Sequence, residues 1–445
     1  MQIDSQVFAR RRQVFMDKMD GGVAIFPAGR VSSRNSDVDY EFRQESDFFY
    51  LTGFEEADAV LMMEPNSENP VTFFVQPRDP VKESWEGPIC GAEGAVRDFG
   101  ADLAFGVEEA PQRVLDALKN QTSLYYGIGT DSSWDQRVIS ALSFYRSRSR
   151  LGEFGPATII DPRNMVHDQR LRKDGAEVEL MARAGAISSE AHCEAMRACR
   201  PGLTEAHLQA ILEIVFRTNG SKRDAYPSIV ATGNNATVLH YRANCDPIKD
   251  GDLILIDAGC EYGYLASDIT RCFPANGRFS NAQKNVYQLV LNAQLAAIEK
   301  CRPGNKFQDV HDTALNVLTQ GLIDLNLIAG PFEDAIKEER YKTFFWHRTS
   351  HWLGMDVHDV GVYQNNGDWQ IFEPGMVLTV EPGLYFSKDN ENAPDEYKGI
   401  GVRIEDDILI TSEGYRVLSA DVPKTITEIE SLMMEEASVN WPSLG

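Results

Sequence analysis

Residues 253–259 read Leu-Ile-Leu-Ile-Asp-Ala-Gly (LILIDAG), an apolar run that ends in a carboxylate and a glycine. Four consecutive large apolar residues are typical of a strand that is buried on both faces. Asp257 follows them directly, and no helix signal comes after it that would make it a helix cap. A buried carboxylate is costly unless it is paired or binds a metal. This stretch therefore predicts a central strand that ends in a functional aspartate.

The same stretch has a second copy further along the chain. DGDLILIDAG, from Asp250, aligns with PGMVLTVEPG, from Pro374, and this alignment places Asp257 on Glu381. Upstream, CRPGLTEAHLQAILEIVF and CRPGNKFQDVHDTALNVL share a CRPG motif and a helical pattern, in the same order. Chance similarity between glycine-bounded strands is the alternative explanation. A duplication predicts a pseudo-twofold unit with both carboxylates near its central axis.

Five residues of metal-binding type lie in this half of the chain, each in a strand-like or glycine-rich segment: Asp257, Asp268, His351, Glu381 and Glu405. Four carboxylates and one imidazole favour Mn²⁺, Fe²⁺, Co²⁺ or Zn²⁺ over a metal that prefers thiolates. A single catalytic zinc takes three protein ligands. Five ligands suit two ions that share bridging carboxylates and activate water, so the set predicts a two-metal hydrolytic centre.

The segment after LILIDAG supports this set. A turn at residues 260–264 (CEYGY) predicts that a second strand, residues 265–273, returns beside the first and brings Asp268 next to Asp257. Two adjacent carboxylates repel each other strongly, and a cation between them removes that cost.

The segment around Glu405 has the alternation of a strand. Arg403 and Glu405 alternate with apolar residues, so we expect both on one face, whereas Asp406 points to the other face and, like Asp407, is a weaker candidate. Arg403 either belongs to a structural ion pair or orients a ligand carboxylate from outside the metal shell.

Four of the eight histidines lie in motif-like segments: His240, His347, His351 and His358. His347 and His351 are four residues apart, as in the HExxH zinc motif, but Arg348 occupies the position of its glutamate, so that motif is absent. A single histidine in such a segment is more often structural than catalytic. In an acidic setting of metal-binding type, we expect at least two of the four to be functional.

The bulk properties exclude several classes of protein. The net charge is −24, and the longest basic run is residues 10–12, so a nucleic-acid partner is not expected. Seven scattered cysteines without CxxC spacing indicate reduced thiols and a cytoplasmic location. The first 26 residues lack the apolar segment of a signal peptide. No apolar run approaches the roughly 18 residues of a membrane span, so a membrane partner is not expected either.

Residues 1–170 differ from the rest of the chain, because they contain none of the metal-type segments. A charged opening helix precedes short apolar runs that read as strands, namely GGVAIFPAG, DFFYLTGF, AVLMMEP, VTFFVQP and SLYYGIG. A charged stretch and a capping box at Asp174 and Glu177 then open a long helical pattern. We therefore place a domain boundary at about residue 170.

Six segments of the chain resemble the Xaa-Pro aminopeptidase (aminopeptidase P) family of dinuclear metallopeptidases. They are RNSDVDYEFRQESDFFYLTGFEE, LILIDAGCEY, SDITRCFPANG, SHWLGMDVHDVGVY, LTVEPGLY and GVRIEDDILI. The resemblance implies an α/β (α+β) protein with two domains. Residues 1–170 would form a smaller N-terminal α/β domain, and residues 171–445 a pseudo-twofold pita-bread catalytic domain of the creatinase/aminopeptidase type.

The resemblance also implies a division of the ligands between two divalent ions, for which Mn²⁺ is expected and Co²⁺ or Zn²⁺ are alternatives. Asp257 and Asp268 would bind one ion, His351 and Glu381 the other, and Asp268 and Glu405 would bridge the two. A bridging hydroxide would then attack the bond before a proline in the second position of a peptide.

Further roles are implied for residues around the metals. Glu381 would handle protons, His240 and His358 would hold the substrate and the tetrahedral intermediate, and Arg403 would orient ligand carboxylates. His347 and Tyr363 would line the pocket. Some tetramers of the family insert a tryptophan into a neighbouring site, and Trp85 is the candidate here, so a homodimer or homotetramer is expected.

Three alternatives use the same fold. A prolidase would require the free carboxylate of a Xaa-Pro dipeptide. A metal-free pita-bread module that only binds peptides, or a creatinase-like amidinohydrolase, would be expected to have lost metal ligands. The chain retains all five, together with His240 and His358.

Overall fold

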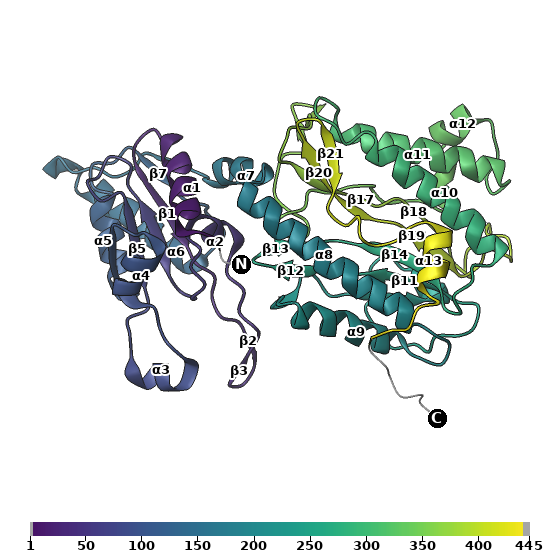
Figure 1. The fold of residues 1–445 in the computed structure, drawn as a ribbon. Helices are drawn as coiled ribbons and strands as arrows, with labels where there is room; N and C mark the ends of the chain where they lie inside the picture. The colour runs from purple at the N-terminus through teal and green to yellow at the C-terminus, as the bar shows by residue number, and fades with distance from the viewer. Residues whose placement is uncertain (1–2, 439–445) are drawn as a thin grey trace. The chain divides into compact units, whose positions relative to one another are not determined.

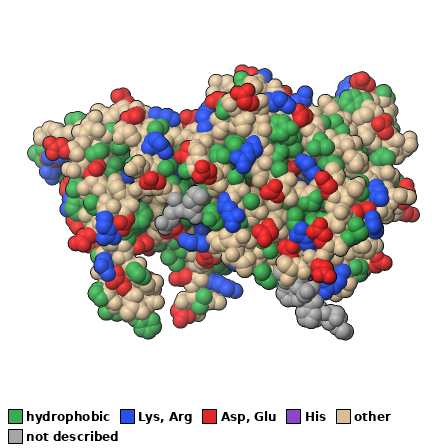
Figure 2. Space-filling model, viewed as in Figure 1, with side chains coloured by type: hydrophobic (Ala, Val, Ile, Leu, Met, Phe, Trp, Pro, Cys, Tyr) green, Lys and Arg blue, Asp and Glu red, His purple; other side chains and the backbone are tan. Residues whose placement is uncertain are grey.

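The computed structural model describes residues 3–438. The chain divides into two compact units, one that ends at Arg170 and one that begins at Leu171 (Figure 1). Among the described residues, no helix combines the length and apolar character needed to cross a bilayer. Figure 2 shows acidic and basic side chains interspersed over the face in view, without a continuous basic surface there.

The N-terminal unit is built on a six-stranded mixed sheet with the order β6-β5-β4-β1-β7-β8. Its strands are β1 (Val23–Pro27), β4 (Val60–Met63), β5 (Val71–Val75), β6 (Leu103–Gly106), β7 (Ser123–Tyr125) and β8 (Thr158–Ile160). A small hairpin, β2 (Ser33–Asn35) and β3 (Val38–Asp39), lies outside this sheet. Three neighbouring interior strands, β5, β4 and β1, are almost entirely buried, as expected for a sheet that is covered on both faces.

Seven helices accompany this sheet. They are α1 (Ser5–Asp17), α2 (Ser46–Thr52), α3 (Pro80–Glu86), α4 (Gly91–Phe99), α5 (Ala110–Ala117), α6 (Ser132–Ser147) and α7 (Arg163–Leu171).

One of the strands predicted in this unit is wrong, because DFFYLTGF forms helix α2. The Glu45 side chain accepts a hydrogen bond from the Phe48 N–H and caps the start of the helix, and Gly53 ends it at a φ of 67°. A short apolar run that is buried all round has no period that separates a strand from a helix. Here the local capping residues decide.

The C-terminal unit contains two copies of a helix pair followed by strands. The first copy consists of α8 (Gly175–Ala198), α9 (Glu205–Thr218), β10 (Ile229–Thr232), β11 (Leu253–Asp257) and β14 (Thr270–Pro274). The second consists of α10 (Asn281–Ile298), α11 (Phe307–Asp324), β17 (Val377–Val380), β20 (Asp406–Thr411) and β21 (Gly414–Val417). Figure 1 shows the strands between the α8–α9 pair and the α10–α11 pair. The predicted α/β class is confirmed.

Capping and burial explain how these elements form. Helix α8 begins at the predicted capping box of Asp174 and Glu177, and α10 begins at a second box, formed by Ser280 and Gln283. The apolar side chains of β11 are at most 1% exposed, so this strand is the centre of its sheet, between β10 and β14.

Shorter elements complete the unit. The strands are β9 (Arg223–Asp224), β12 (Cys260–Tyr262), β13 (Leu265–Ala266), β15 (Gln364–Asn365), β16 (Asp368–Trp369), β18 (Gly383–Phe386) and β19 (Ile400–Arg403). The helices are α12 (Phe332–Lys337) and α13 (Ile426–Leu432). Strands β18 and β19 form an antiparallel pair in which Gly383 lies opposite Arg403.

The predicted strand over residues 265–273 is interrupted. It consists of β13 and β14, and Asp268 lies in the gap between them. The cause is a close backbone approach, since a Cβ on Gly259 would lie 1.8 Å from the Ser267 carbonyl oxygen. Glu405 lies in the corresponding gap between β19 and β20, where its N–H donates to the Thr270 carbonyl at 3.1 Å. Both carboxylates thus lie just before the returning strand of their copy.

Candidate metal centre

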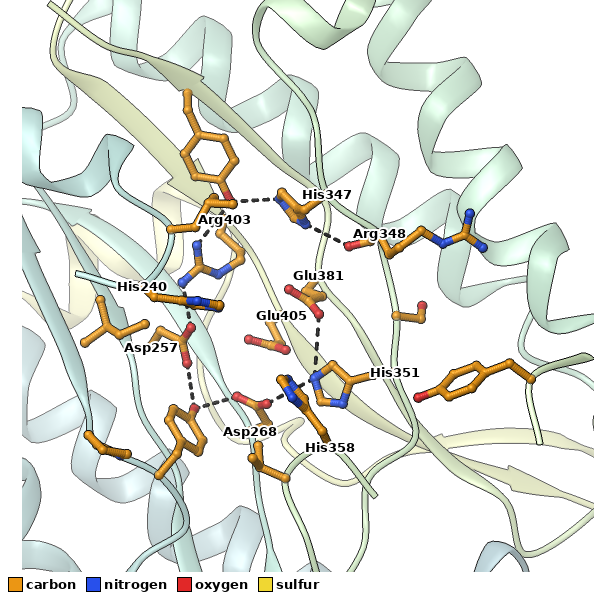
Figure 3. Close-up of a pocket in the computed structure, with 18 of the residues that line it drawn as sticks. His240, Asp257, Asp268, His347, Arg348, His351, His358, Glu381, Arg403 and Glu405 are labelled. Carbon is orange, nitrogen blue, oxygen red and sulfur yellow. Dashed lines mark hydrogen bonds and ion pairs between the residues drawn. The ribbon is translucent and has the colours of Figure 1, made fainter. Parts of the chain in front are cut away.

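All five residues of metal-binding type line one cavity of about 810 Å³ (Figure 3). Asp257 ends β11, Glu381 directly follows β17, and Asp268 and Glu405 lie in the two strand gaps. The two copies therefore contribute two carboxylates each. His240, His347, His358, Tyr363 and Arg403 line the same cavity.

The tightest part of the cluster is formed by Asp268, His351 and Glu405. One potential ligand atom from each lies within 4.8 Å of the other two. His351 Nε2 is 3.4 Å from Asp268 Oδ2 and 3.6 Å from Glu381 Oε1. His351 Nδ1 lies 3.0 Å from the Trp352 carbonyl oxygen. A proton on Nδ1 donates to that oxygen and leaves the Nε2 lone pair for a cation, the usual arrangement of a metal-binding histidine.

The electrostatics of the cluster favour the binding of a cation. Burial raises the pKa of Asp268, and it raises that of Glu405 well above its usual range, with further contributions from neighbouring carboxylates. Burial also raises the pKa of Glu381 to about 7, even though His351 and Arg403 oppose the shift. For His351, burial would lower the pKa, but Asp268 and Glu381 outweigh it and raise the pKa to about 9. The carboxylates lack enough buried positive charge to be ionised together.

The donor set fits divalent metal ions. Hard carboxylate oxygens and one imidazole nitrogen converge from both copies, and their mutual repulsion is the cost that a divalent cation removes. Asp257 Oδ1 and Asp268 Oδ1 both lie within hydrogen-bond distance of the Tyr226 hydroxyl, at 2.6 and 2.5 Å. That hydroxyl has one proton, so it satisfies only one of the two carboxylates at a time.

Arg403 begins a chain of hydrogen bonds that ends at His347. Arg403 Nη2 donates to Asp257 Oδ2 at 2.6 Å, and Nη1 donates to the Tyr385 hydroxyl at 3.1 Å. The Tyr385 hydroxyl is 2.9 Å from His347 Nε2, and His347 Nδ1 is 2.7 Å from the Arg348 carbonyl oxygen. Burial and the Arg403 charge lower the pKa of His347 to about 4, so it is neutral, with its proton on Nδ1.

Two tyrosines of the site escaped the sequence analysis. Tyr226 precedes a proline in a loop, and Tyr385 lies in an apolar strand, so neither has a local pattern of its own. A weak signal for Tyr385 is its spacing from Gly383, because residues two apart in a strand share a face. A Cβ on Gly383 would lie 2.5 Å from the Tyr385 hydroxyl, so the glycine leaves room for that hydroxyl to reach Arg403.

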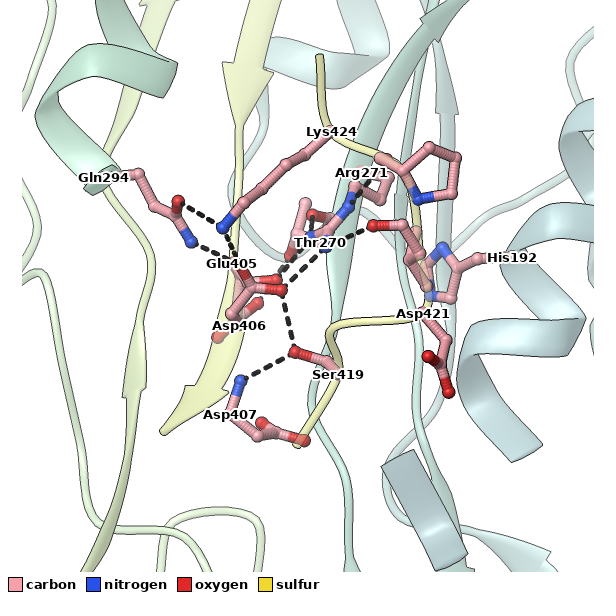
Figure 4. Close-up of polar contacts among 12 residues, drawn as sticks. His192, Thr270, Arg271, Gln294, Glu405, Asp406, Asp407, Ser419, Asp421 and Lys424 are labelled. Atoms are coloured by element: carbon pink, nitrogen blue, oxygen red, sulfur yellow. Dashed lines mark hydrogen bonds and ion pairs between the residues drawn. The ribbon is translucent and has the colours of Figure 1, made fainter. Parts of the chain in front are cut away.

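Asp406 and Asp407 do not line the cavity but support it from behind (Figure 4). The Asp406 carboxylate is fully buried and receives hydrogen bonds from four side chains, those of Arg271, Gln294, Ser419 and Lys424. Arg271 also donates to the Glu405 carbonyl at 2.6 Å. Asp407 accepts the Asp268 N–H at 3.1 Å. The predicted orientation of Asp406 away from Glu405 is confirmed.

The remaining candidates differ in their surroundings. His358 lies against His351, with ring centroids 4.4 Å apart, and His240 is an exposed side chain on the cavity wall. The Tyr363 hydroxyl accepts the Trp352 N–H at 3.0 Å. Trp85 belongs to the N-terminal unit, where it lies on α3 and is 83% exposed.

A cluster of hard ligands held between two repeated helix–strand units defines a metal-dependent hydrolase. The chain belongs to metallopeptidase family M24, whose family model matches residues 179–412. A second model, the N-terminal domain of aminopeptidase P, matches residues 8–125.

Known proteins resemble the chain over nearly its whole length. The Xaa-Pro aminopeptidase of Escherichia coli is 42% identical over 437 residues, which cover 97% of this chain and 98% of the relative. That of Haemophilus influenzae is 40% identical, over 95% and 96%. The solved structure of aminopeptidase PepP from Pseudomonas aeruginosa superposes with a TM-score of 0.96 at 46% identity, over 97% of this chain and 98% of the other.

Proposed function

We propose that the protein is a metal-dependent Xaa-Pro aminopeptidase that removes the first residue of peptides whose second residue is proline. The observation that carries the proposal is the convergence of four carboxylates and His351 in one cavity, in a chain that matches Xaa-Pro aminopeptidases over nearly its whole length. Curated relatives at this level of identity bear that name, so the prolidase alternative is not favoured.

Asp257, Asp268 and Glu405 are proposed to bind one divalent ion, and Asp268, His351, Glu381 and Glu405 a second, so that Asp268 and Glu405 are shared. Two bound ions supply an activated water and polarise the scissile carbonyl. Mn²⁺ is the proposed native ion because of the resemblance to the aminopeptidase P family, since the donor set by itself suits Mn²⁺, Co²⁺ and Zn²⁺ alike. The relative from Escherichia coli has been solved in a zinc-substituted form, so Zn²⁺ and Co²⁺ remain the alternatives.

The side chains around the ions divide the remaining work. Glu381 is proposed to accept the proton of the attacking water at its carboxylate and to deliver it to the departing proline nitrogen. His240 and His358 hold the carbonyl of the scissile bond and the developing oxyanion, and neutral His347 and Tyr363 line the substrate cavity. Arg403 holds Asp257 in place.

The proposal extends to the setting of the protein. We assign residues 1–170 and 171–445 to the N-terminal and catalytic domains. Seven unpaired thiols support a cytoplasmic location. A large tryptophan exposed on a short helix, Trp85, supports a homodimer or homotetramer in which it reaches a neighbouring subunit.

The test is a paired hydrolysis assay with added Mn²⁺ that compares a Xaa-Pro-Xaa tripeptide with the matching Xaa-Pro dipeptide. Release of the first residue from the tripeptide is expected. Cleavage of the dipeptide alone would identify a prolidase. Cleavage of neither, at saturating metal, would contradict the proposal and leave a binding module.

A further inference from the structure

The charges that line the cavity are segregated by sign. All four acidic lining residues belong to the metal cluster, and the other fully charged residues are arginines, namely Arg242, Arg348 and Arg403. The chain as a whole has 67 acidic and 43 basic side chains, so a random wall would be acidic. Arg403 is buried against Asp257, whereas Arg242 and Arg348 are exposed. The cavity thus has a negative centre and positive outer walls.

Arg348 is held in place by two contacts. Its Nη2 donates to Gln308 Oε1 at 2.5 Å, and its guanidinium lies over the ring of Trp369, 5.0 Å from the centroid. Trp369 stacks on Phe307, which makes an edge contact with Tyr363. All three aromatic side chains line the cavity. The Arg348 guanidinium therefore packs on an aromatic wall and is oriented by Gln308 and Trp369 before any ligand binds.

The position of this guanidinium suits the far end of a substrate. Figure 3 shows Arg348 across the cavity from His240, with its guanidinium directed away from the carboxylate cluster. The α-ammonium group of a peptide is attracted to the carboxylates, and an extended tripeptide spans about 10 Å. A guanidinium has five N–H donors, and Gln308 uses one of them, so a carboxylate can still be bound by two parallel hydrogen bonds.

We propose that Arg348 and the aromatic wall of Phe307, Tyr363 and Trp369 form a subsite for the free carboxylate of the residue that follows proline. This inference rests on the proposed aminopeptidase function and specifies its substrates. They are short Xaa-Pro-Xaa peptides with a free C-terminus, in preference to peptides whose carboxylate is amidated.

Arg242 provides a matched control. It lines the same cavity and is also exposed, but within residues 3–438 it makes no hydrogen bond, ion pair or cation–π contact. A side chain without an anchor loses more conformational entropy when it binds a ligand, so Arg348 is the better carboxylate receptor of the two.

The test compares kcat/KM for a Xaa-Pro-Xaa tripeptide and for its C-terminal amide, in the wild type and in R348M, R348K and R242M, at low ionic strength. The wild type is expected to favour the free acid about tenfold, as for one charge-assisted, bidentate contact. R348M should bring the ratio of acid to amide to about one. R348K should give an intermediate ratio, because lysine keeps the charge without the planar fork. R242M should retain the wild-type ratio.

Added salt should weaken the wild-type preference, since the contact is exposed. An equal kcat/KM for acid and amide in the wild type would overturn the subsite while leaving the aminopeptidase intact. A preference that survives R348M, or one that R242M removes, would overturn the assignment to Arg348. Failure of the wild type to cleave either peptide would overturn the proposed function and the subsite with it.

Discussion

Asp268 is a side chain that we expect to be indispensable for chemistry and dispensable for folding. Its carboxylate lies 3.4 Å from His351 Nε2 and within hydrogen-bond distance of Tyr226. Burial raises its pKa, so without a metal it is a cost to the fold rather than a contribution. A neutral side chain of the same shape should therefore fold well and bind metal poorly.

The substitution Asp268→Asn should reduce activity by more than the roughly 10–100-fold that the loss of an outer-shell partner costs. The melting temperature of the metal-free protein should stay equal or rise, because one of several repelling carboxylates is gone. Both are measured on purified protein at saturating Mn²⁺ and after chelation.

Asp406→Asn is the control for this variant. It removes a buried partner of Arg271 and should destabilise the fold by about 3–5 kcal/mol. Full activity of Asp268→Asn at saturating metal would remove Asp268 from the centre.

At the residue scale, the sequence was sufficient to predict the functional side chains that interrupt an apolar pattern. Asp257 follows four buried residues and has a counterpart in Glu381, so both were predictable. Tyr385 and Tyr226 were not, because a tyrosine in an apolar setting is ordinary. Their roles depend on the distance between their hydroxyls and Arg403 or Asp268, which only the tertiary structure defines.

At the scale of elements, one loop of the site is attached to a helix end. Glu205, the first residue of α9, is fully buried. Its carboxylate accepts hydrogen bonds from the backbone or side chains of Thr232, Asn235, Tyr241 and Asp246. A helix N-terminus stabilises such a charge. The loop that carries His240 is therefore held on both sides of that residue.

We expect Glu205→Gln to lower kcat/KM, because its amide group meets donors where the carboxylate accepted them, at a cost of about 2 kcal/mol. If Glu205 acts through His240, the loss should be much smaller in a His240→Ala background than in the wild type. Glu213→Gln, on the same helix, should have little effect. Additive losses in the double variant would show that Glu205 supports only the fold.

The β18–β19 pair makes a second element-scale prediction. Gly383→Ala places a methyl group 2.5 Å from the Tyr385 hydroxyl and 2.9 Å from the Val402 carbonyl oxygen, which should cost about 1–3 kcal/mol of stability. Adding Tyr385→Phe removes the hydroxyl but leaves the ring carbon Cζ at 2.8 Å from the new methyl group, so the double variant should regain only part of the lost melting temperature. A double variant no more stable than Gly383→Ala would place the strain elsewhere.

Elements were predictable where a helical pattern follows a capping box, as in α8, or where an apolar run is bounded by a glycine, as in β11. The prediction was wrong for α2 and for the strand over residues 265–273. Helix α2 is a short run buried on all sides, so its apolar residues show no periodicity that distinguishes a helix from a strand. The close approach of Gly259 to Ser267, which interrupts the strand, likewise leaves no pattern in the sequence. The second of these features matters most, because the interruption it causes is where Asp268 lies.

At the scale of the whole molecule, the metal centre couples stability to pH. Burial raises the pKa of Glu381 from its usual 4.5 to about 7, and that of His351 is raised to about 9 by its acidic neighbours in spite of burial. Between pH 7 and pH 9 the folded metal-free protein therefore binds more protons than the unfolded chain, whereas the buried histidines with lowered pKa, such as His347, are neutral in both states. Its free energy of unfolding therefore falls as the pH rises.

The melting temperature of chelated protein should consequently decrease from pH 7 to pH 9. Mn²⁺, which replaces the protons, should raise it more at pH 8 than at pH 6. Thermal unfolding with and without metal across this range measures both effects, and Asp268→Asn should reduce the gain from metal. A gain that is independent of pH would mean that metal does not compete with these protons.

The three consecutive acids Glu405, Asp406 and Asp407 have a consequence for genetics. One faces the metal cluster, one joins β20 to Arg271 of the other copy, and one holds the backbone of Asp268. A scan of all substitutions, scored by growth, would mark the three positions as equally intolerant. Intolerance to substitution would thus not reveal the chemical role of each residue. Only a screen that scores protein abundance separately from catalytic activity would distinguish Glu405, the proposed ligand, from Asp406 and Asp407.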